Sequence, residues 1–141
     1  MTQIDFYTNA ADKFRIACVI AAKAYERGLR TLIYVPDAAT GGKLDQLLWS
    51  TPALGFVPHC LAGDELAAVT PIVIDQRGED VTHDDVLLNL CAERPPFFSR
   101  FQRLVEIVGL DEEDKAAARE RWRFYRERGY ALDTHDTGKK R

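Results

Sequence analysis

The chain has 141 residues, of which 46% are hydrophobic and 29% are charged, a composition typical of one globular domain with a single core. Collagen-like, coiled-coil and low-complexity proteins are excluded by this composition. Nineteen Lys and Arg residues against 22 Asp and Glu residues give a net charge of −3. A protein that holds nucleic acid through its overall positive field is therefore disfavoured, and any contact with DNA is expected to be local or indirect.

Signals for membranes, secretion and disulfide bonds do not occur in the sequence. The longest unbroken apolar run, residues 16–22, has seven residues, whereas a helix that spans a bilayer needs about 20. The N-terminus carries Asp5 and no basic stretch before an apolar segment, unlike a secretory signal. Cys18, Cys60 and Cys91 form no CxxC pair and are predicted to be buried free thiols. We expect a cytoplasmic protein with no membrane partner.

The first 35 residues predict a strand, a helix and a second strand. Residues 3–7 alternate in polarity like a strand. Apolar residues then recur at helical spacing after Asn9, a candidate helix cap, and the helix is expected to stop at Gly28. Residues 31–35 (TLIYV) are almost wholly apolar, as in a strand that is covered on both faces. This βαβ unit predicts a parallel sheet with a right-handed crossover.

The middle of the chain predicts one more helix and further strands. Leucines spaced i, i+3, i+4 indicate a helix over residues 40–50. Residues 56–61 are predicted to be extended, at a sheet edge or in a loop, because they contain Pro58. Residues 71–76 predict a strand, and residues 86–90 fit either a strand or a helix.

The C-terminal part predicts a strand at residues 104–108 and then the most distinctive element, a basic amphipathic helix over residues 111–128. Four acids open this helix, where negative charge is favoured, and Gly129 is a candidate stop. Residues 134–141 are polar and are expected to be frayed. Together the elements predict one α/β domain over residues 1–133, with a mostly parallel central sheet flanked by helices.

Catalytic motifs are incomplete throughout the sequence. Gly41-Gly42-Lys43 lacks the early glycine and the Ser or Thr of a phosphate loop, where Asp37 and Leu44 stand. No GxGxxG follows the first strand. His83-Asp84-Asp85 is interpreted as a solvated loop, because adjacent residues do not converge on one ion. His59 and the cysteine after it point to opposite faces of a strand, so His59 is interpreted as a structural or surface histidine. A binding or assembly role without metal or cofactor is favoured over an enzyme.

Two candidate surfaces remain. Arg119, Trp122, Arg123 and Arg126 are spaced i, i+3, i+4, i+7 and share one face of the last helix. An indole flanked by guanidinium groups can receive an aromatic side chain and bind a carboxylate. The alternative is a solvated basic face with Trp122 packed inward. The second surface is the Trp49 and Phe56 region, where aromatics beside prolines form a candidate partner anchor, with core packing as the alternative.

The order and spacing of several motifs resemble the chi subunit family of bacterial DNA polymerase III, from about residue 4 to residue 130. The most specific blocks are an LD-x-x-LW segment followed by FVPH, and a terminal ARER-x-x-x-YR helix; in this sequence they are Leu44-Asp45-Gln46-Leu47-Leu48-Trp49, Phe56-Val57-Pro58-His59 and Ala118-Arg119-Glu120-Arg121 with Tyr125-Arg126. The resemblance implies a Rossmann-like domain without nucleotide chemistry.

The resemblance also implies partners and sites. It implies an accessory clamp-loader subunit that pairs with the psi subunit and binds the acidic C-terminal tail of single-stranded-DNA-binding protein, as a monomer or heterodimer. The tail site carried over by position consists of Arg119, Trp122 and Arg123, lined by Val108, with Arg126 in the basic surround. Family members often have Tyr and Lys where this chain has Trp122 and Arg123, which retain an aromatic ring and a cation. Trp49 and Phe56 match positions implicated in binding psi or a repair helicase that competes for the same surface.

Two other classes of function stay open from the residues. One is a small α/β nucleotide-binding enzyme with an unusual phosphate site near Thr40-Gly41-Gly42. The other is direct binding of nucleic acid by the terminal helix, which the acidic total charge and the scarcity of aromatic stacking residues disfavour.

Overall fold

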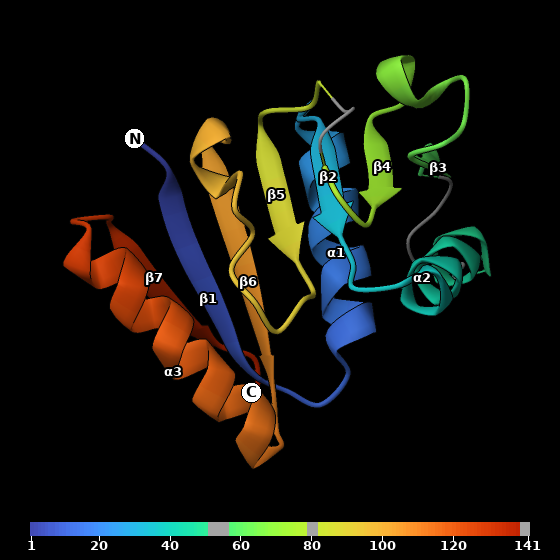
Figure 1. The fold of residues 1–141 in the computed structure, drawn as a ribbon. Coiled ribbons are helices and arrows are strands. Elements are labelled where there is room, and N and C mark those ends of the chain that lie inside the picture. The colour runs from blue at the N-terminus through green and yellow to red at the C-terminus, as the bar shows by residue number, and fades with distance from the viewer. Residues whose placement is uncertain (51–56, 79–81, 139–141) are drawn as a thin grey trace.

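The computed structural model describes residues 1–50, 57–78 and 82–138, which form a seven-stranded parallel sheet with helices on both faces (Figure 1). The strands are β1 (Gln3–Ala10), β2 (Thr31–Tyr34), β3 (His59–Leu61), β4 (Ile72–Asp75), β5 (Val86–Asn89), β6 (Arg103–Gly109) and β7 (Leu132–Asp136). Their order across the sheet is β3-β4-β2-β5-β6-β1-β7. The helices are α1 (Lys13–Glu26), α2 (Ala38–Ser50) and α3 (Glu112–Glu127), with short 3₁₀ turns η2 (Ala67–Val69) and η3 (Phe98–Arg100). The predicted α/β class and Rossmann-like arrangement are confirmed.

The sheet separates two hydrophobic clusters. Side chains such as Ile33, Leu88 and Val105 pack with α1 and α2 on one face. Their strand neighbours Leu32 and Leu104, which point the opposite way, pack with α3 on the other face. Because both faces are covered, the central strands are almost continuously apolar, which is why β2 was recognisable in the sequence.

The segment at residues 86–90, which the sequence left open between strand and helix, forms β5 between β2 and β6. All four residues of β5 are buried, so its pattern shows no polar alternation. The predicted cap of α1 is wrong. Asp12 accepts a hydrogen bond from the Arg15 amide at 3.2 Å, and Asn9 lies at the irregular end of β1 with φ of +57°. Asn9 donates instead to Asp136 at 3.1 Å.

The expected frayed tail is wrong for residues 134–136, which belong to the edge strand β7 and pair in parallel with β1. Beyond the strand, both the amide and the hydroxyl of Thr137 donate to the Thr8 carbonyl at 2.9 Å. The strand pairs with β1 through backbone hydrogen bonds along one edge only, and four of its five residues are exposed. Exposed positions do not require apolar side chains, so the strand can be polar. The hydropathy pattern of the sequence therefore gives little indication of β7.

Candidate functional site

Both ends of the helix α3 carry residues that favour helix termination. The Asp111 side chain accepts a hydrogen bond from the Asp114 amide at 2.8 Å, and three acids occupy the first turn beside the positive end of the helix dipole. At the other end, Gly129 takes a φ of +84°, which a residue without Cβ adopts at little cost. Lys13 on α1 also reaches Asp114, at 3.1 Å, and ties the start of α3 to the N-terminal half of the chain.

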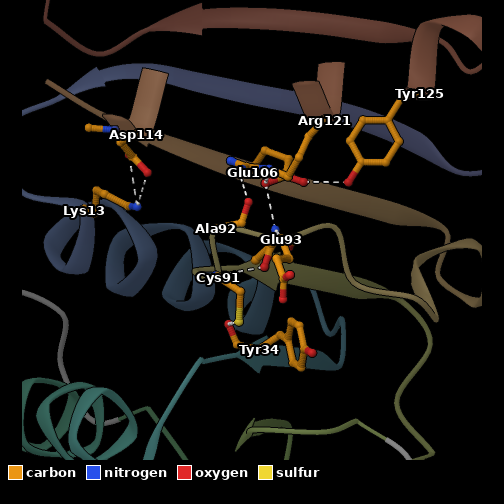
Figure 2. A network of polar contacts seen from close by, with 11 residues as sticks. Lys13, Tyr34, Cys91, Ala92, Glu93, Glu106, Asp114, Arg121 and Tyr125 are labelled. Carbon is orange, nitrogen blue, oxygen red and sulfur yellow. Dashed lines mark hydrogen bonds and ion pairs between the residues drawn. The ribbon is translucent and has the colours of Figure 1, made fainter. Parts of the chain in front are cut away.

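A buried polar network joins α3 to the sheet (Figure 2). Arg121 and Glu106 have side-chain exposures of 4% and 0%, and the Arg121 Nε donates to Glu106 Oε1 at 3.0 Å. Tyr125 donates its hydroxyl to Glu106 Oε2 at 2.6 Å, and the Asn89 amide donates to Oε1 at 2.9 Å. Arg121 also donates to the Ala92 carbonyl at 2.6 Å. The inward side of α3 is therefore fixed by specific bonds as well as by apolar packing.

Burial dominates the electrostatics of this network. It raises the pKa of the Glu106 carboxyl, and the Arg121 guanidinium and the three hydrogen bonds oppose that shift. Burial and the neighbouring Glu106 charge both raise the pKa of the Tyr125 hydroxyl, so Tyr125 keeps the proton that it donates to Glu106.

One edge of α3 forms a pocket of about 330 Å³ with β1, β6 and β7. Its apolar lining includes Phe6, Val108 and Trp122, with the rings of Phe6 and Trp122 edge to face at 5.1 Å between centroids. Lys115 and Arg119 supply two cations at this pocket. An apolar hollow beside two cations can accept an aromatic side chain and a carboxylate together.

The pocket collects some of the predicted residues and leaves others outside. Val108, Arg119 and Trp122 line it together. Arg123 instead lies in an exposed ion pair with Glu120 at 2.8 Å, and Arg126 is exposed on the same helix without lining the pocket. Trp122 packs inward on Phe6, as the alternative expected, and it also lines the pocket.

Sequence reasoning missed Lys115 and the strand wall of the pocket. Lys115 precedes Arg119 by four residues, so extending the recognised helix face by one turn toward the N-terminus identifies it. Thr8 and Asn9 from β1 and Thr134 from β7 also line the pocket. Thr134 gives no such signal, because its place depends on β7 joining the sheet.

The second predicted surface lies at the end of α2. Trp49 is 60% exposed, and its ring is 4.8 Å from that of His59. His59 itself is buried, with Nδ1 2.7 Å from the Val57 carbonyl oxygen and Nε2 3.3 Å from Asp45 Oδ1, as expected for a structural histidine. Phe56 lies outside the described residues.

The structure disfavours the phosphate site. Thr40, Gly41 and Gly42 lie within α2 and form no loop. The hollow beside Gly41 is lined by Asp37 and Asp75, whose carboxylates would repel a phosphate.

The prediction of a solvated loop is wrong for His83. Its side chain is fully buried, with Nε2 2.5 Å from the Thr70 carbonyl oxygen, and burial lowers the pKa of His83. The segment turns inward because Arg100 donates to the His83 carbonyl and Asp85 accepts from the Arg30 amide.

The three cysteines are free, and Cys18 is buried, while Cys60 and Cys91 are partly buried. Over residues 1–50, 57–78 and 82–138, no three His, Cys, Asp or Glu side chains are arranged to hold a metal ion. In the same part of the chain, no helix has both the length and the apolar character required to cross a membrane.

Comparison with known proteins relates this sequence to one family. The family model described as DNA polymerase III chi subunit, HolC, matches residues 1–133. The DNA polymerase III subunit chi of Pseudomonas aeruginosa is 35% identical over 139 residues, which cover 96% of each chain. Proteins of the same name from Haemophilus influenzae and Escherichia coli are 35% and 34% identical, over 87% and 85% of this chain and 86% and 82% of their own.

Proposed function

Because the chain belongs to the DNA polymerase III chi subunit family, we propose that it is a non-catalytic accessory subunit of the replicative polymerase that joins two partners. One partner is the psi subunit, through which it contacts the clamp loader. The other is the acidic C-terminal tail of single-stranded-DNA-binding protein. In this role it contacts nucleic acid only indirectly, which suits its net charge of −3.

The pocket on α3 is the observation that carries the tail-binding proposal. An acidic tail that ends in an aromatic residue requires an apolar hollow, a cation for the terminal carboxylate and a basic surround. Trp122, Phe6 and Val108 provide the hollow, and Arg119 and Lys115 provide the adjacent cations. Arg123 and Arg126 are exposed on the same helix and contribute long-range attraction for the acidic residues that precede the tail end.

Calorimetric titration tests this assignment. The ligand is a short acidic peptide that ends in Asp-Phe and contains several prolines, and the control peptide lacks the terminal Phe. We expect binding that depends on the Phe, and a loss on the order of 2 kcal/mol in Arg119→Ala, because truncation leaves the carboxylate without its cation. Arg126→Ala, which removes the same charge outside the pocket, is the matched control and is expected to have a much smaller effect. Equal affinities of the wild type and Arg119→Ala contradict the assignment.

The Trp49 region supports the proposal for psi. An indole that is 60% exposed at a helix end has the properties of an interface anchor. A repair helicase that uses the same surface would compete with psi, so a single subunit would hold one of them at a time. Co-purification of psi with the protein, with and without added helicase, measures this competition directly.

A further inference from the structure

The sheet face that carries α1 and α2 is not covered by helix along its whole width. On this face α1 packs against β2 and β6, while α2 lies farther along, over β3 and β4 (Figure 1). Beyond β6, no helix of the described residues lies over β1 and β7 on this face. Side chains of the strands contact one another there instead. The Tyr7 ring stacks on His135 at 4.6 Å between centroids, and Asp5 is bound by Arg103 and by His135. In parallel sheets, helices normally cover such strands.

A groove of about 440 Å³ runs between α1 and the strands β5, β6 and β1, with Thr137, just after β7, at its rim. One side is a stripe of α1, in which Ile16, Ile20, Lys23 and Arg27 follow one another at i, i+4, i+7 and i+11. The floor and the far side come from the strands and include Val105 and Tyr7. We call this feature the α1 groove. It is separate from the pocket on α3, because it lies on the opposite face of the sheet.

The groove combines an incompletely buried apolar surface with positive charge. Ile16, Ile20 and Tyr7 are only partly buried. Lys23 and Arg27 are exposed beside them, and the Arg103 side chain, which binds Asp5, remains 50% exposed. Within the described residues, no carboxylate forms an ion pair with Lys23 or Arg27. The described residues thus place three cations around an apolar hollow and supply a carboxylate to only one of them.

We propose that the α1 groove is a docking site for an amphipathic acidic helix of a partner protein. Apolar side chains of that helix would fill the hollow beside Ile16 and Ile20, and its carboxylates would bind Lys23, Arg27 and Arg103. A helix fits better than an extended peptide because a helix beside α1, about 8–10 Å away, completes the layer that α1 and α2 begin. The proposal does not depend on the tail pocket or on Trp49.

The probe is a synthetic 18-residue helical peptide with leucines on one face and glutamates along both sides. A peptide of the same design with lysines in place of the glutamates is the control. Backbone amide NMR of the whole protein locates the contact, and calorimetry gives the affinity. The test variant is the double charge reversal Lys23→Glu with Arg27→Glu, at exposed positions. The matched variant, Arg15→Glu with Lys43→Glu, has the same total charge and changes two exposed cations outside the groove.

We expect the glutamate peptide to perturb amides of α1, β1 and β6 around the groove, with affinity at least about tenfold weaker in the groove variant than in the matched variant. The lysine peptide should bind the wild type poorly and the groove variant better. Absence of binding by the glutamate peptide, equal affinity in the two variants, or shifts confined to α3 overturns the proposal. So does sedimentation that shows a dimer of the wild type which the groove variant no longer forms, because a second copy of the chain would then be the occupant. Arg119→Ala should leave the peptide's affinity unchanged, so a failure here is distinguishable from a failure of the tail assignment.

Discussion

Replacing Arg121 by leucine tests how α3 is held on the sheet. The change removes the cation beside Glu106, whose side chain has 0% exposure, and leaves a carboxylate that water cannot solvate. Breaking a buried ion pair by removing one partner costs about 3–5 kcal/mol. Glu106 keeps hydrogen bonds from Tyr125 at 2.6 Å and Asn89 at 2.9 Å, so we place the loss near the lower limit, at about 3 kcal/mol. That loss lowers the ratio of folded to unfolded protein more than 100-fold.

Urea denaturation followed by circular dichroism measures this loss, and the helix itself provides the control. Arg123 and Glu120 form an ion pair of similar length, 2.8 Å, but their side chains are 62% and 69% exposed. Arg123→Leu is therefore expected to cost no more than about 1 kcal/mol. A double replacement, Glu106→Leu with Arg121→Leu, should recover part of the loss, because it leaves no unpaired buried charge, although the Tyr125 hydroxyl and the Asn89 amide each lose an acceptor. Equal losses for Arg121→Leu and Arg123→Leu, or additive effects in the double variant, would refute this account of the network.

The pH dependence of the same variant follows from the raised pKa of Glu106. A carboxyl with a higher pKa in the folded state binds more protons there, so stability falls as pH rises from the unfolded-state pKa to the folded-state pKa. Arg121 counteracts the shift, and its removal raises the folded-state pKa further. The loss caused by Arg121→Leu should thus be largest above the folded-state pKa and should shrink on acidification, as Glu106 becomes neutral. Denaturation curves at several pH values measure this trend, and a loss that stays constant as pH falls contradicts it.

Three further predictions concern other parts of the molecule. Trp49→Ala should reduce co-purification of psi but change the urea midpoint little, because the ring is largely exposed; loss of tail binding as well would indicate unfolding. Phe6→Ala removes a buried ring that packs against Trp122 and should lower the free energy of unfolding by about 3–5 kcal/mol. It should also lower the affinity for the tail peptide in calorimetry; an unchanged affinity would show that Phe6 does not contribute to the pocket. Gly78→Ala should destabilise the fold by more than about 1 kcal/mol, because φ is +74° and the new Cβ would collide with the Phe97 ring; an unchanged melting temperature would contradict this.

The sequence predicted the parts of the fold that hydrophobic burial determines. β2 was recognisable because its own residues are almost all apolar, as a strand covered on both faces requires, and the βαβ unit of β1, α1 and β2 followed from it. β7 was not recognisable, because Leu132–Asp136 is stabilised by pairing with β1 along one edge of the sheet and buries little apolar surface. The prediction that His83 is exposed to solvent was wrong for a related reason. Its burial depends on hydrogen bonds with Thr70 and Arg100, which are distant in sequence and leave no local pattern.

The candidate site likewise contains residues that the sequence pattern predicted and residues that it could not predict. Helical spacing brought Arg119 and Trp122 to one face, and the structure places both at the pocket. Spacing could not show that Arg123 pairs with Glu120, since ion pairing depends on side-chain conformations at the surface. It also could not supply Phe6 and Thr134, which reach the pocket through the pairing of β1 with its neighbours.

The two arginines of the ARER segment connect the packing of α3 on the sheet with the shape of the pocket. Arg119 and Arg121 are two residues apart, about 200° around the helix, so they project to opposite sides of α3. Arg121 is held by Glu106 inside the protein, and Arg119 lines the pocket. Because the buried network and Tyr125 fix the rotation of α3, the pocket exists before any ligand arrives, and less ordering is required on binding. Tyr125→Phe removes one bond to Glu106 at a residue that does not line the pocket. This variant should therefore weaken binding of the tail peptide although it changes the chemical identity of no pocket side chain. The same affinity in Tyr125→Phe and the wild type would show that the network stabilises the fold without shaping the pocket.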